Sequence, residues 1–264
     1  MLSDNKPINI LVFDIETIPD VSGIRILNNL GRDLSDNDVV QWAQQKQRSE
    51  TGNDCIPLYL HQVVAISCCF CRDNKIDVKS IGNLQDSEKV IIQTFFDILK
   101  KYQVQLVSWN GVGFDLPVLQ HRALVHGVIA GDYWNRYEFN SELKWNNCIT
   151  HHCMKYCDLM NILAGYQDRA CAPLHDMARL CGFPGKLGMD GAQVLQVYQQ
   201  GGIEKIRNTC ETDAMDIYLL FLRFQLMKGS IEEVEYLNKI QNLKDYLKSE
   251  SSEHFLAYLS HFSD

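Results

Sequence analysis

Hydrophobic and polar residues alternate along the first part of the chain in the way that β-strands require. Residues 8–13 form a short apolar run rich in β-branched side chains, and residues 63–71 and 75–80 form two more. A polar turn at 72–74 joins the last two runs, which is typical of an antiparallel hairpin. We therefore expect the first strand and the hairpin to form a three-stranded antiparallel meander.

Further along the chain the spacing of apolar residues changes to that of helices. Residues 87–101 carry apolar side chains three and four apart, and another short strand follows at 104–108. A helix that crosses to a further strand indicates a mixed sheet. Beyond residue 116 the pattern is mostly helical, with long helices at 203–228 and 230–249. The pattern as a whole predicts an α/β fold.

The polar segment 21–55 interrupts this pattern. It holds turn and cap residues around one predicted helix at 38–47, so we expect a surface insertion. The sequence contains no linker, internal repeat or low-complexity stretch. We expect a single domain over residues 1–264, with a motif-bearing core at about 9–228 and a C-terminal helical extension at 230–264.

Composition and charge narrow the function classes. The hydrophobic fraction of 46% is ample for a buried core, and the formal charge of −8 argues against a protein that grips duplex nucleic acid over a broad basic surface. The chain starts without a leader pattern and lacks the roughly 18 consecutive apolar residues of a membrane span. We expect a soluble cytoplasmic protein without a membrane partner, whose ten scattered cysteines are reduced thiols.

One cluster of cysteines and histidines allows an alternative. Thiolates and imidazoles that lie near each other bind zinc, but the spacing in this cluster contains no C-x2-C pair. A zinc protein is therefore kept as a separate hypothesis. The cluster comprises Cys148, His151, His152, Cys153 and Cys157.

Two acidic residues end the first apolar run. Asp14 and Glu16 stand two apart in the segment VFDIET, so a strand places both on the same face. Carboxylates side by side repel each other and raise their own pKa values unless a divalent cation supplies positive charge. Oxygen ligands of this kind suit Mg²⁺ or Mn²⁺ better than zinc. The alternative is a frayed strand end with two hydrated acids.

Two later segments each offer a carboxylate that could join this pair. Asp115 follows a strand and a glycine turn, at the expected N-cap of a helix, where it either caps the helix or joins the pair. Asp213 and Asp216 share an otherwise apolar face of the predicted helix 203–228, and a carboxylate on such a face requires a partner. Glu211 points to a different side of that helix, and we expect it to be solvated.

The segments FDIET, WNGVGFDLPVL and CETDAMDIYLLFLRFQ, in this order, resemble the three exonuclease motifs of the DEDD superfamily. The chain is similar to bacterial stand-alone proteins described as predicted 3′ to 5′ exonucleases related to the proofreading domain of family B DNA polymerases. The resemblance runs from about Asn9 to about Lys228 and leaves out the final helices. It implies a ribonuclease-H-like mixed five-stranded sheet, made of the meander plus parallel strands and flanked by helices.

The resemblance also implies a chemistry. A 3′ to 5′ exonuclease of this kind hydrolyses single-stranded DNA or RNA from the 3′ end and releases nucleoside monophosphates. Asp14, Glu16, Asp115 and Asp213 would hold two Mg²⁺ or Mn²⁺ ions, with Asp14 as the bridging ligand. One ion would activate water and the other would stabilise the departing 3′ oxygen, at a separation of roughly 3.5–4 Å. Single-stranded 3′ ends are the expected partners.

This chain departs from the resembling proteins at one catalytic position. They carry a tyrosine four residues before the last aspartate, where it helps to orient the attacking water, and Thr209 stands there in this sequence. One interpretation is that Thr209 is a catalytic residue that holds the water through its hydroxyl. Another is that this role passes to Tyr218 or Asp216. The alternative is a catalytically impaired module that still binds metal and single-stranded ends.

Substrate contacts are expected around the same motifs. The resemblance places Thr17 and Ile18 against the terminal nucleotide. An aromatic side chain can stack on an unpaired base, which makes Trp109 a candidate, and Arg122 and Lys186 are candidates for contact with phosphate. The full set of candidate substrate-binding residues is Thr17, Ile18, Trp109, Asn110, Phe114, Arg122 and Lys186.

Overall fold

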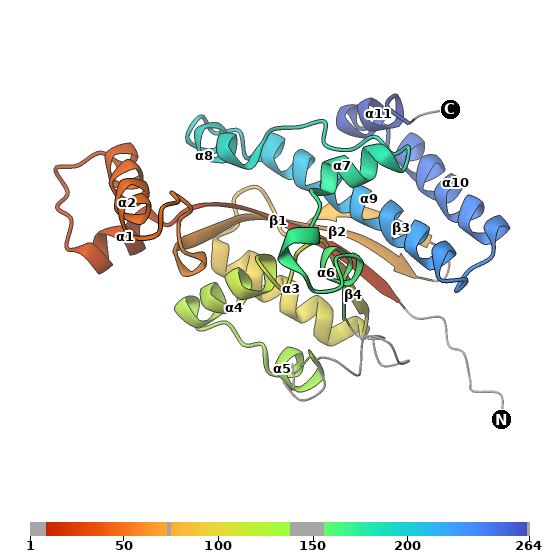
Figure 1. Cartoon of the computed structure of the whole chain (residues 1–264), viewed down its shortest axis with the longest axis horizontal. Helices are drawn as coiled ribbons and strands as arrows, with labels where there is room; N and C mark the ends of the chain where they lie inside the picture. The colour runs from red at the N-terminus through yellow and green to blue at the C-terminus, as the bar shows by residue number, and fades with distance from the viewer. Residues whose placement is uncertain (1–8, 73–74, 138–155, 263–264) are drawn as a thin grey trace.

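The computed structural model describes residues 9–72, 75–137 and 156–262, and its centre is a five-stranded sheet in the order β3-β2-β1-β4-β5 (Figure 1). The first three strands along the chain are antiparallel neighbours, and the last two run parallel to β1. The expected meander and the mixed α/β sheet are therefore confirmed. The strands are β1 (Ile10–Pro19), β2 (His61–Arg72), β3 (Lys75–Ser80), β4 (Gln105–Ser108) and β5 (Tyr156–Asp158).

Helices cover both faces of this sheet. In Figure 1, α3 and α4 lie on one side of it, and α7, α9 and α10 lie on the other. The predicted helices at 87–101, 203–228 and 230–249 are present within a few residues. The helices are α1 (Val21–Asn28), α2 (Asp36–Thr51), α3 (Glu88–Tyr102), α4 (Asp115–His126), α5 (Gly131–Tyr137), α6 (Leu159–Leu163), α7 (Leu174–Leu180), α8 (Gly191–Gln199), α9 (Ile203–Met227), α10 (Glu233–Glu250) and α11 (Glu253–Leu259).

Side chains of β1 alternate between two hydrophobic cores. Leu11 and Phe13 pack with α3 and α4, whereas Val12 packs on the opposite face with α9. Asp14 and Glu16 continue the face of Val12, because side chains two apart in a strand point the same way. The hydrophobic alternation thus directs both carboxylates toward α9.

The pairing of β1 with β2 contains one irregularity. The register shifts by one residue between Glu16 and Thr17, which is a β-bulge. Beyond the bulge, β1 continues toward α1, and α1 and α2 project from the sheet at the left of Figure 1. These two helices enclose a small core of their own that includes Ile24 and Val39. The segment 21–55 is therefore an insertion outside the sheet, as its polar pattern predicts.

The C-terminal helices pack on α9 and on β3. Leu243 on α10 and Tyr258 on α11 are fully buried in the same core as α9. The expectation that Glu211 is solvated was wrong, because β3 and α11 cover that side of α9. Its Oε1 accepts hydrogen bonds from the backbone N–H and the hydroxyl of Ser80, both at 2.7 Å, and its Oε2 lies 2.9 Å from His254 Nε2.

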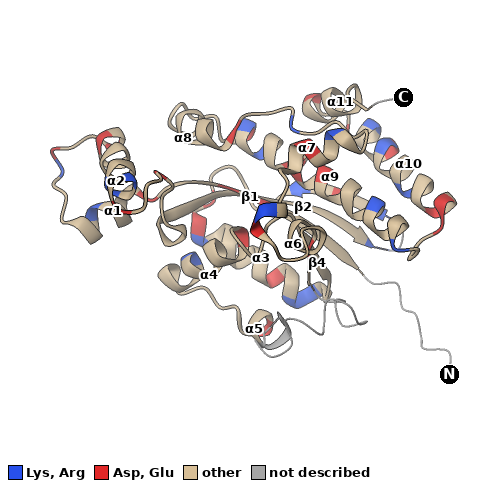
Figure 2. Ribbon diagram, in the orientation of Figure 1, with Lys and Arg blue, Asp and Glu red and all other residues tan. Residues whose placement is uncertain are grey.

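The described residues also show how charges are distributed, whether any helix suits a membrane and what state the cysteines have. Figure 2 shows Lys and Arg scattered among Asp and Glu over the helices. No helix in the described ranges is both long enough and apolar enough to cross a membrane. All eight cysteines of these ranges are free thiols. In the hypothetical zinc cluster, Cys157 is buried in the core, and the other four positions lie outside the described residues.

Candidate active site

Three carboxylates from two elements meet beside β1. Asp14 and Glu16 on β1 and Asp213 on α9 each offer one oxygen atom, and these atoms lie within 4.8 Å of one another. Glu16 and Asp213 are buried, and Asp14 is partly buried. The strand aligns the first two side chains, and α9 brings the third because it packs along β1 on this face. The structure thus groups three of the four predicted metal ligands.

The fourth predicted ligand, Asp115, lies next to this group. It is the first residue of α4, and Phe114 takes the N-cap position that the sequence assigned to Asp115. The buried carboxyl of Asp115 accepts a hydrogen bond from the backbone N–H of Ile15, between the two acidic residues of β1, and its charge helps to raise the pKa of Asp14. Metal binding by all four carboxylates remains a prediction.

Burial and mutual repulsion raise the pKa values of these carboxyls. Desolvation is the largest cause at each of them, and it raises the pKa of Glu16 and of Asp115 to about 7. At Asp14 the charges of Asp115, Asp213 and Glu16 add to it, so its pKa lies well above the usual range. Asp213 Oδ1 is buried and accepts no hydrogen bond from any described residue. A buried carboxylate oxygen without a donor fits a site that binds a cation.

Lys186 brings a positive charge to the cluster from the loop between α7 and α8. Its Nζ lies 3.6 Å from Asp213 Oδ2. Burial lowers the pKa of Lys186, but the carboxylates of Asp213, Glu16 and Asp14 outweigh this effect, so the net shift is upward. The prediction that Lys186 contacts phosphate is compatible with this position beside the predicted metal ligands.

The raised pKa of Glu16 predicts how the stability of the metal-free protein depends on pH. Folding raises this pKa from an ordinary value of 4.5 to about 7. The folded state then holds a proton that the unfolded state releases, so this stabilisation is complete below about pH 4.5 and is lost as the pH rises through about 7. The loss corresponds to roughly 3 kcal/mol of unfolding free energy. The unfolding free energy of wild type and of Glu16→Gln is measured in EDTA at several pH values. If it depends on pH in the same way for both proteins, the prediction is contradicted.

Thr209 occupies a tightly packed position one turn before Asp213. It is buried, and its Oγ1 donates a hydrogen bond to the backbone oxygen of Lys205 at 3.2 Å. A methyl group added to Gly188 would lie only 2.2 Å from Thr209 Oγ1, so the backbone of the loop packs directly on this side chain. A tyrosine at position 209 therefore needs a displacement of that loop.

Asp158 at the end of β5 organises the loop before Asp115, a role that sequence reasoning missed. Its carboxylate accepts hydrogen bonds from the backbone N–H groups of Asn110 at 3.0 Å and Val112 at 2.9 Å. It also accepts two hydrogen bonds from Asn161. Asn110 itself adopts the left-handed conformation, with φ of 64°. The available signal was an acidic residue directly after a short apolar strand, the pattern that also marks Asp14 on β1.

The other candidate substrate residues differ in their surroundings. Thr17 Oγ1 lies 2.8 Å from His61 Nδ1, and the His61 ring meets the ring of Phe114 edge to face at 5.2 Å. Ile18 is buried with α8 and α9. Trp109 is buried as well, and its Nε1 donates to the backbone oxygen of Ala172 at 3.1 Å. This burial places the Trp109 ring in the core and argues against stacking on a base.

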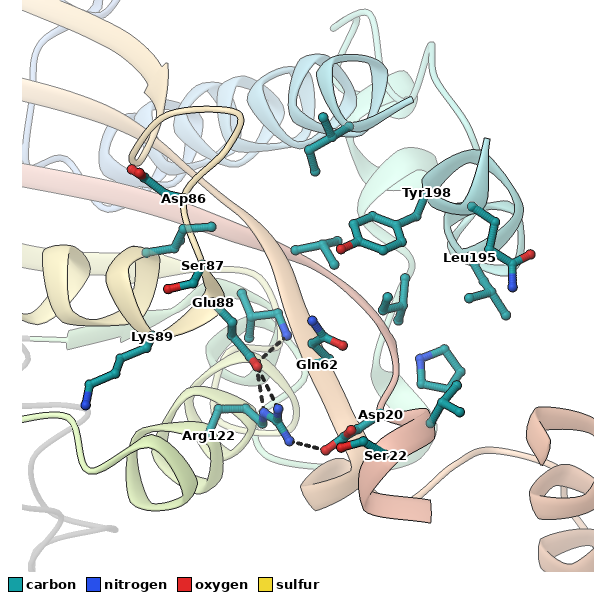
Figure 3. Close-up of a pocket in the computed structure, with 18 of the residues that line it drawn as sticks. Asp20, Ser22, Gln62, Asp86, Ser87, Glu88, Lys89, Arg122, Leu195 and Tyr198 are labelled. Atoms are coloured by element: carbon teal, nitrogen blue, oxygen red, sulfur yellow. Dashed lines mark hydrogen bonds and ion pairs between the residues drawn. The ribbon is translucent and has the colours of Figure 1, made fainter. Parts of the chain in front are cut away.

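Arg122 requires a correction, because the structure does not place it for contact with phosphate. Its guanidinium is buried and donates to both oxygens of Glu88, at 2.7 and 2.6 Å, and to Asp20 Oδ2 at 2.5 Å. His126 Nε2 also lies 2.7 Å from Glu88 Oε2. Figure 3 shows how Asp20, directly after β1, Glu88 at the start of α3 and Arg122 on α4 converge. Arg122 therefore joins elements of the fold.

A cavity of about 1070 Å³ opens beside this ion-pair network (Figure 3). The end of β1, the start of β2, the segment before α3, and parts of α4 and α8 line it. Ile18 and Arg122 belong both to this lining and to the predicted substrate contacts, whereas the four predicted metal ligands are not part of it. The cavity and the carboxylate cluster are therefore separate features of the molecule.

Comparison with known proteins tests the resemblance. No curated protein matches the chain. The model of a family described as "predicted 3′-5′ exonuclease related to the exonuclease domain of PolB" matches residues 53–262. This range includes Asp115 and Asp213 and extends over α10 and α11, which the motif resemblance left out. It begins after Asp14 and Glu16, and the geometry of the cluster joins these two residues to Asp213. The chain therefore belongs to this family of predicted 3′-5′ exonucleases related to the exonuclease domain of PolB.

Proposed function

We propose that this protein is a two-metal 3′ to 5′ exonuclease that releases nucleoside monophosphates from the 3′ ends of single-stranded DNA or RNA. The family supplies the reaction class. The observation that carries the proposal is the convergence of oxygen atoms from Asp14, Glu16 and Asp213 within 4.8 Å. Hydrolysis of a phosphodiester requires stabilisation of negative charge, and carboxylates provide it through bound cations.

The residues present fit two divalent cations. The donors are hard carboxylate oxygens, which suit Mg²⁺ and Mn²⁺, and Asp213 Oδ1 has no hydrogen-bond partner among the described residues. The raised pKa values of Glu16 and Asp115 indicate a shortage of positive charge at the cluster. When bound, the cations would lower the pKa of the attacking water and stabilise charge on the phosphate oxygens. Asp14, Glu16, Asp115 and Asp213 would hold them.

Residues around the cluster have their own tasks in this proposal. Asp158 holds the loop of Asn110 and Val112, which keeps Asp115 at the start of α4 beside β1. Lys186 pairs with Asp213 in the absence of cations. Once the carboxylates are neutralised, its ammonium group is free to donate to a phosphate oxygen of the substrate.

Degradation of 5′-labelled single strands tests the proposal directly. DNA and RNA of the same sequence are incubated with Mg²⁺, with Mn²⁺ or with EDTA. The expected result is a ladder of products shortened stepwise from the 3′ end, present with either metal and absent in EDTA. Internal cuts, or intact strands at millimolar metal, would reject exonuclease activity.

A second candidate function has support from Thr209. The hydroxyl proton of Thr209 is donated to the Lys205 backbone oxygen, so the side chain makes a bond within α9. A protein without a water-orienting residue at this position would bind metal and single-stranded 3′ ends without hydrolysing them. Metal-dependent anisotropy of a fluorescent single strand, with no ladder from the same strand, would identify this function.

Thr209→Tyr is expected to destabilise the fold and to leave hydrolysis no faster. The added ring meets the backbone at Gly188, where even a methyl group would lie 2.2 Å from Thr209 Oγ1. Overpacking of this kind costs about 1–3 kcal/mol. Melting temperature and hydrolysis rate are compared with Thr209→Val, which keeps the shape and removes the hydroxyl. Faster hydrolysis by the tyrosine variant at an unchanged melting temperature would show that the loop yields readily.

A further inference from the structure

Three hydrogen bonds fix two successive peptide groups of the loop that carries Lys186. Each of these groups is held by a side chain from α7 or α9, so the backbone of the loop has little freedom next to the carboxylate cluster. In chain order the three hydrogen bonds run from Arg179 Nη1 to the Pro184 oxygen at 3.2 Å, from the Gly185 N–H to Asp216 Oδ1 at 3.2 Å, and from the Lys186 N–H to His175 Nδ1 at 2.8 Å.

The glycine in the middle of this loop fits the arrangement closely. Gly185 adopts a left-handed φ of 68°, which favours glycine. A methyl group on it would lie 2.8 Å from His175 Nδ1 and 2.9 Å from Arg179 Cδ. The chain around Gly185 is thus packed against α7 on one side and bonded to Asp216 on the other.

Asp216 is fully buried and joins this loop to the end of the chain. Its Oδ1 accepts the Gly185 N–H and also the hydroxyl of Tyr258, which lies 2.6 Å away on α11. Tyr258 is fully buried too. Asp216 Oδ2 is buried and has no hydrogen-bond partner among the described residues. Asp213, the predicted metal ligand, lies one helical turn before Asp216.

Attachment of the C-terminal helices alone does not account for this carboxylate. A buried acid carries a desolvation cost of several kcal/mol, and apolar residues fill such positions at lower cost. Tyr246 on α10 illustrates the cheaper solution, because its hydroxyl bonds to the backbone N–H and oxygen of Val78 at 3.1 Å each. Asp216 differs in that its partner is the backbone of the loop that places Lys186.

We propose that Asp216 is a positioning residue that holds Lys186 over the carboxylate cluster, and that Tyr258 fixes Asp216 for this task. The inference rests on the proposed function, which gives Lys186 its place in the site. The contacts run without a gap from α11 through Asp216 and Gly185 to the residue whose Nζ lies 3.6 Å from Asp213. The C-terminal helix thereby contributes to the site without touching substrate.

A double-mutant cycle on Mn²⁺ affinity tests the proposal independently of turnover. Lys186→Met removes a positive charge from the cluster and is expected to tighten Mn²⁺ binding about three- to tenfold. Asp216→Leu releases Gly185 and should tighten binding by a similar factor, because Lys186 is no longer held in place. The double variant should bind Mn²⁺ no more tightly than Lys186→Met alone. Electron paramagnetic resonance of free Mn²⁺ measures each Kd.

Matched variants separate positioning from charge and from stability. Asp216→Asn loses the charge but keeps an oxygen that accepts the Gly185 N–H, so its Kd should stay near that of wild type. Tyr258→Phe removes one hydroxyl and should tighten binding about twofold, in the presence of Lys186 only. Tyr246→Phe makes the same change on α10 and should leave the Kd unchanged.

The outcomes distinguish this inference from the proposed function. Additive effects of Lys186→Met and Asp216→Leu, or equal effects of leucine and asparagine at position 216, would overturn the positioning role. If the effects of Lys186→Met and Asp216→Leu on the Kd are not additive, and wild type hydrolyses no strand, the positioning role is supported and the exonuclease is rejected. If wild type hydrolyses strands but the two substitutions have additive effects on the Kd, the exonuclease is supported and the positioning role is rejected.

Discussion

Asp14→Asn is expected to abolish hydrolysis and yet to stabilise the metal-free protein. Desolvation and the charges of Asp115, Asp213 and Glu16 raise the pKa of Asp14 well above its usual range. A neutral side chain of the same shape removes this repulsion, so the unfolding temperature in EDTA should rise. The same change removes the predicted bridging ligand, and the hydrolysis rate should fall on the order of 10³-fold.

One control serves both the expected gain in stability and the expected loss of hydrolysis. Asp245 on α10 is exposed, and its carboxylate accepts a hydrogen bond from Gln241. Asp245→Asn should leave both stability and hydrolysis unchanged. In wild type, Mg²⁺ or Mn²⁺ should raise the unfolding temperature, and in Asp14→Asn this rise should be largely lost. An Asp14→Asn protein that still hydrolyses strands, or that melts earlier than wild type in EDTA, would contradict the proposed cluster.

Arg122→Met is expected to produce the largest loss of stability among the substitutions considered. It leaves Glu88 buried beside Asp20 without the guanidinium that bonds to both. Removal of one partner from a buried ion pair costs about 3–5 kcal/mol of unfolding free energy. Hydrolysis by the folded fraction should be retained, because Arg122 is bonded to these two acids and not to the cluster. Urea unfolding and initial rates measure the two effects.

Arg48 provides the matched control for this substitution. It pairs with Asp54 at the surface, where both side chains are exposed. Exposed pairs contribute about 0–1 kcal/mol, so Arg48→Met should change the unfolding free energy little. Equal losses for the two variants would show that the Arg122 network does not stabilise the fold. A weakened apparent affinity for the strand in Arg122→Met, at unchanged stability, would restore the assignment of Arg122 to phosphate contact.

Local periodicity predicted the sheet and the shared face of Asp14 and Glu16, because both follow from the geometry of a single strand. The helical spacing in 203–228 similarly placed Asp213 on an apolar face. Contacts between distant segments carry no such local signal. Arg122 finds its partners 102 residues away at Asp20 and 34 residues away at Glu88, and nothing in its own segment distinguishes it from a solvated arginine.

The same limit explains the wrong expectation for Glu211 and the burial of Trp109, which the sequence did not reveal. The helical spacing correctly predicted that Glu211 points to a different side of α9 from Asp213. It could not predict that β3 and α11 cover that side and shield Glu211 from solvent. Trp109 stands in the segment that carries the predicted metal ligand Asp115, yet its indole nitrogen donates a hydrogen bond to the backbone oxygen of Ala172 on another segment. Motif spacing therefore located the carboxylate cluster, whereas the burial of its neighbours required the tertiary structure.

The β-bulge between Glu16 and Thr17 divides the carboxylate pair of β1 from the part of the strand that leads to α1. The additional strands end before the bulge, since β4 pairs with β1 only as far as Val12 and β3 pairs with β2 only up to Ser67, the partner of Asp14. After the bulge, β1 and β2 continue as a two-stranded ribbon that carries α1 and α2. Insertions or deletions in that ribbon can leave the spacing of Asp14 and Glu16 intact.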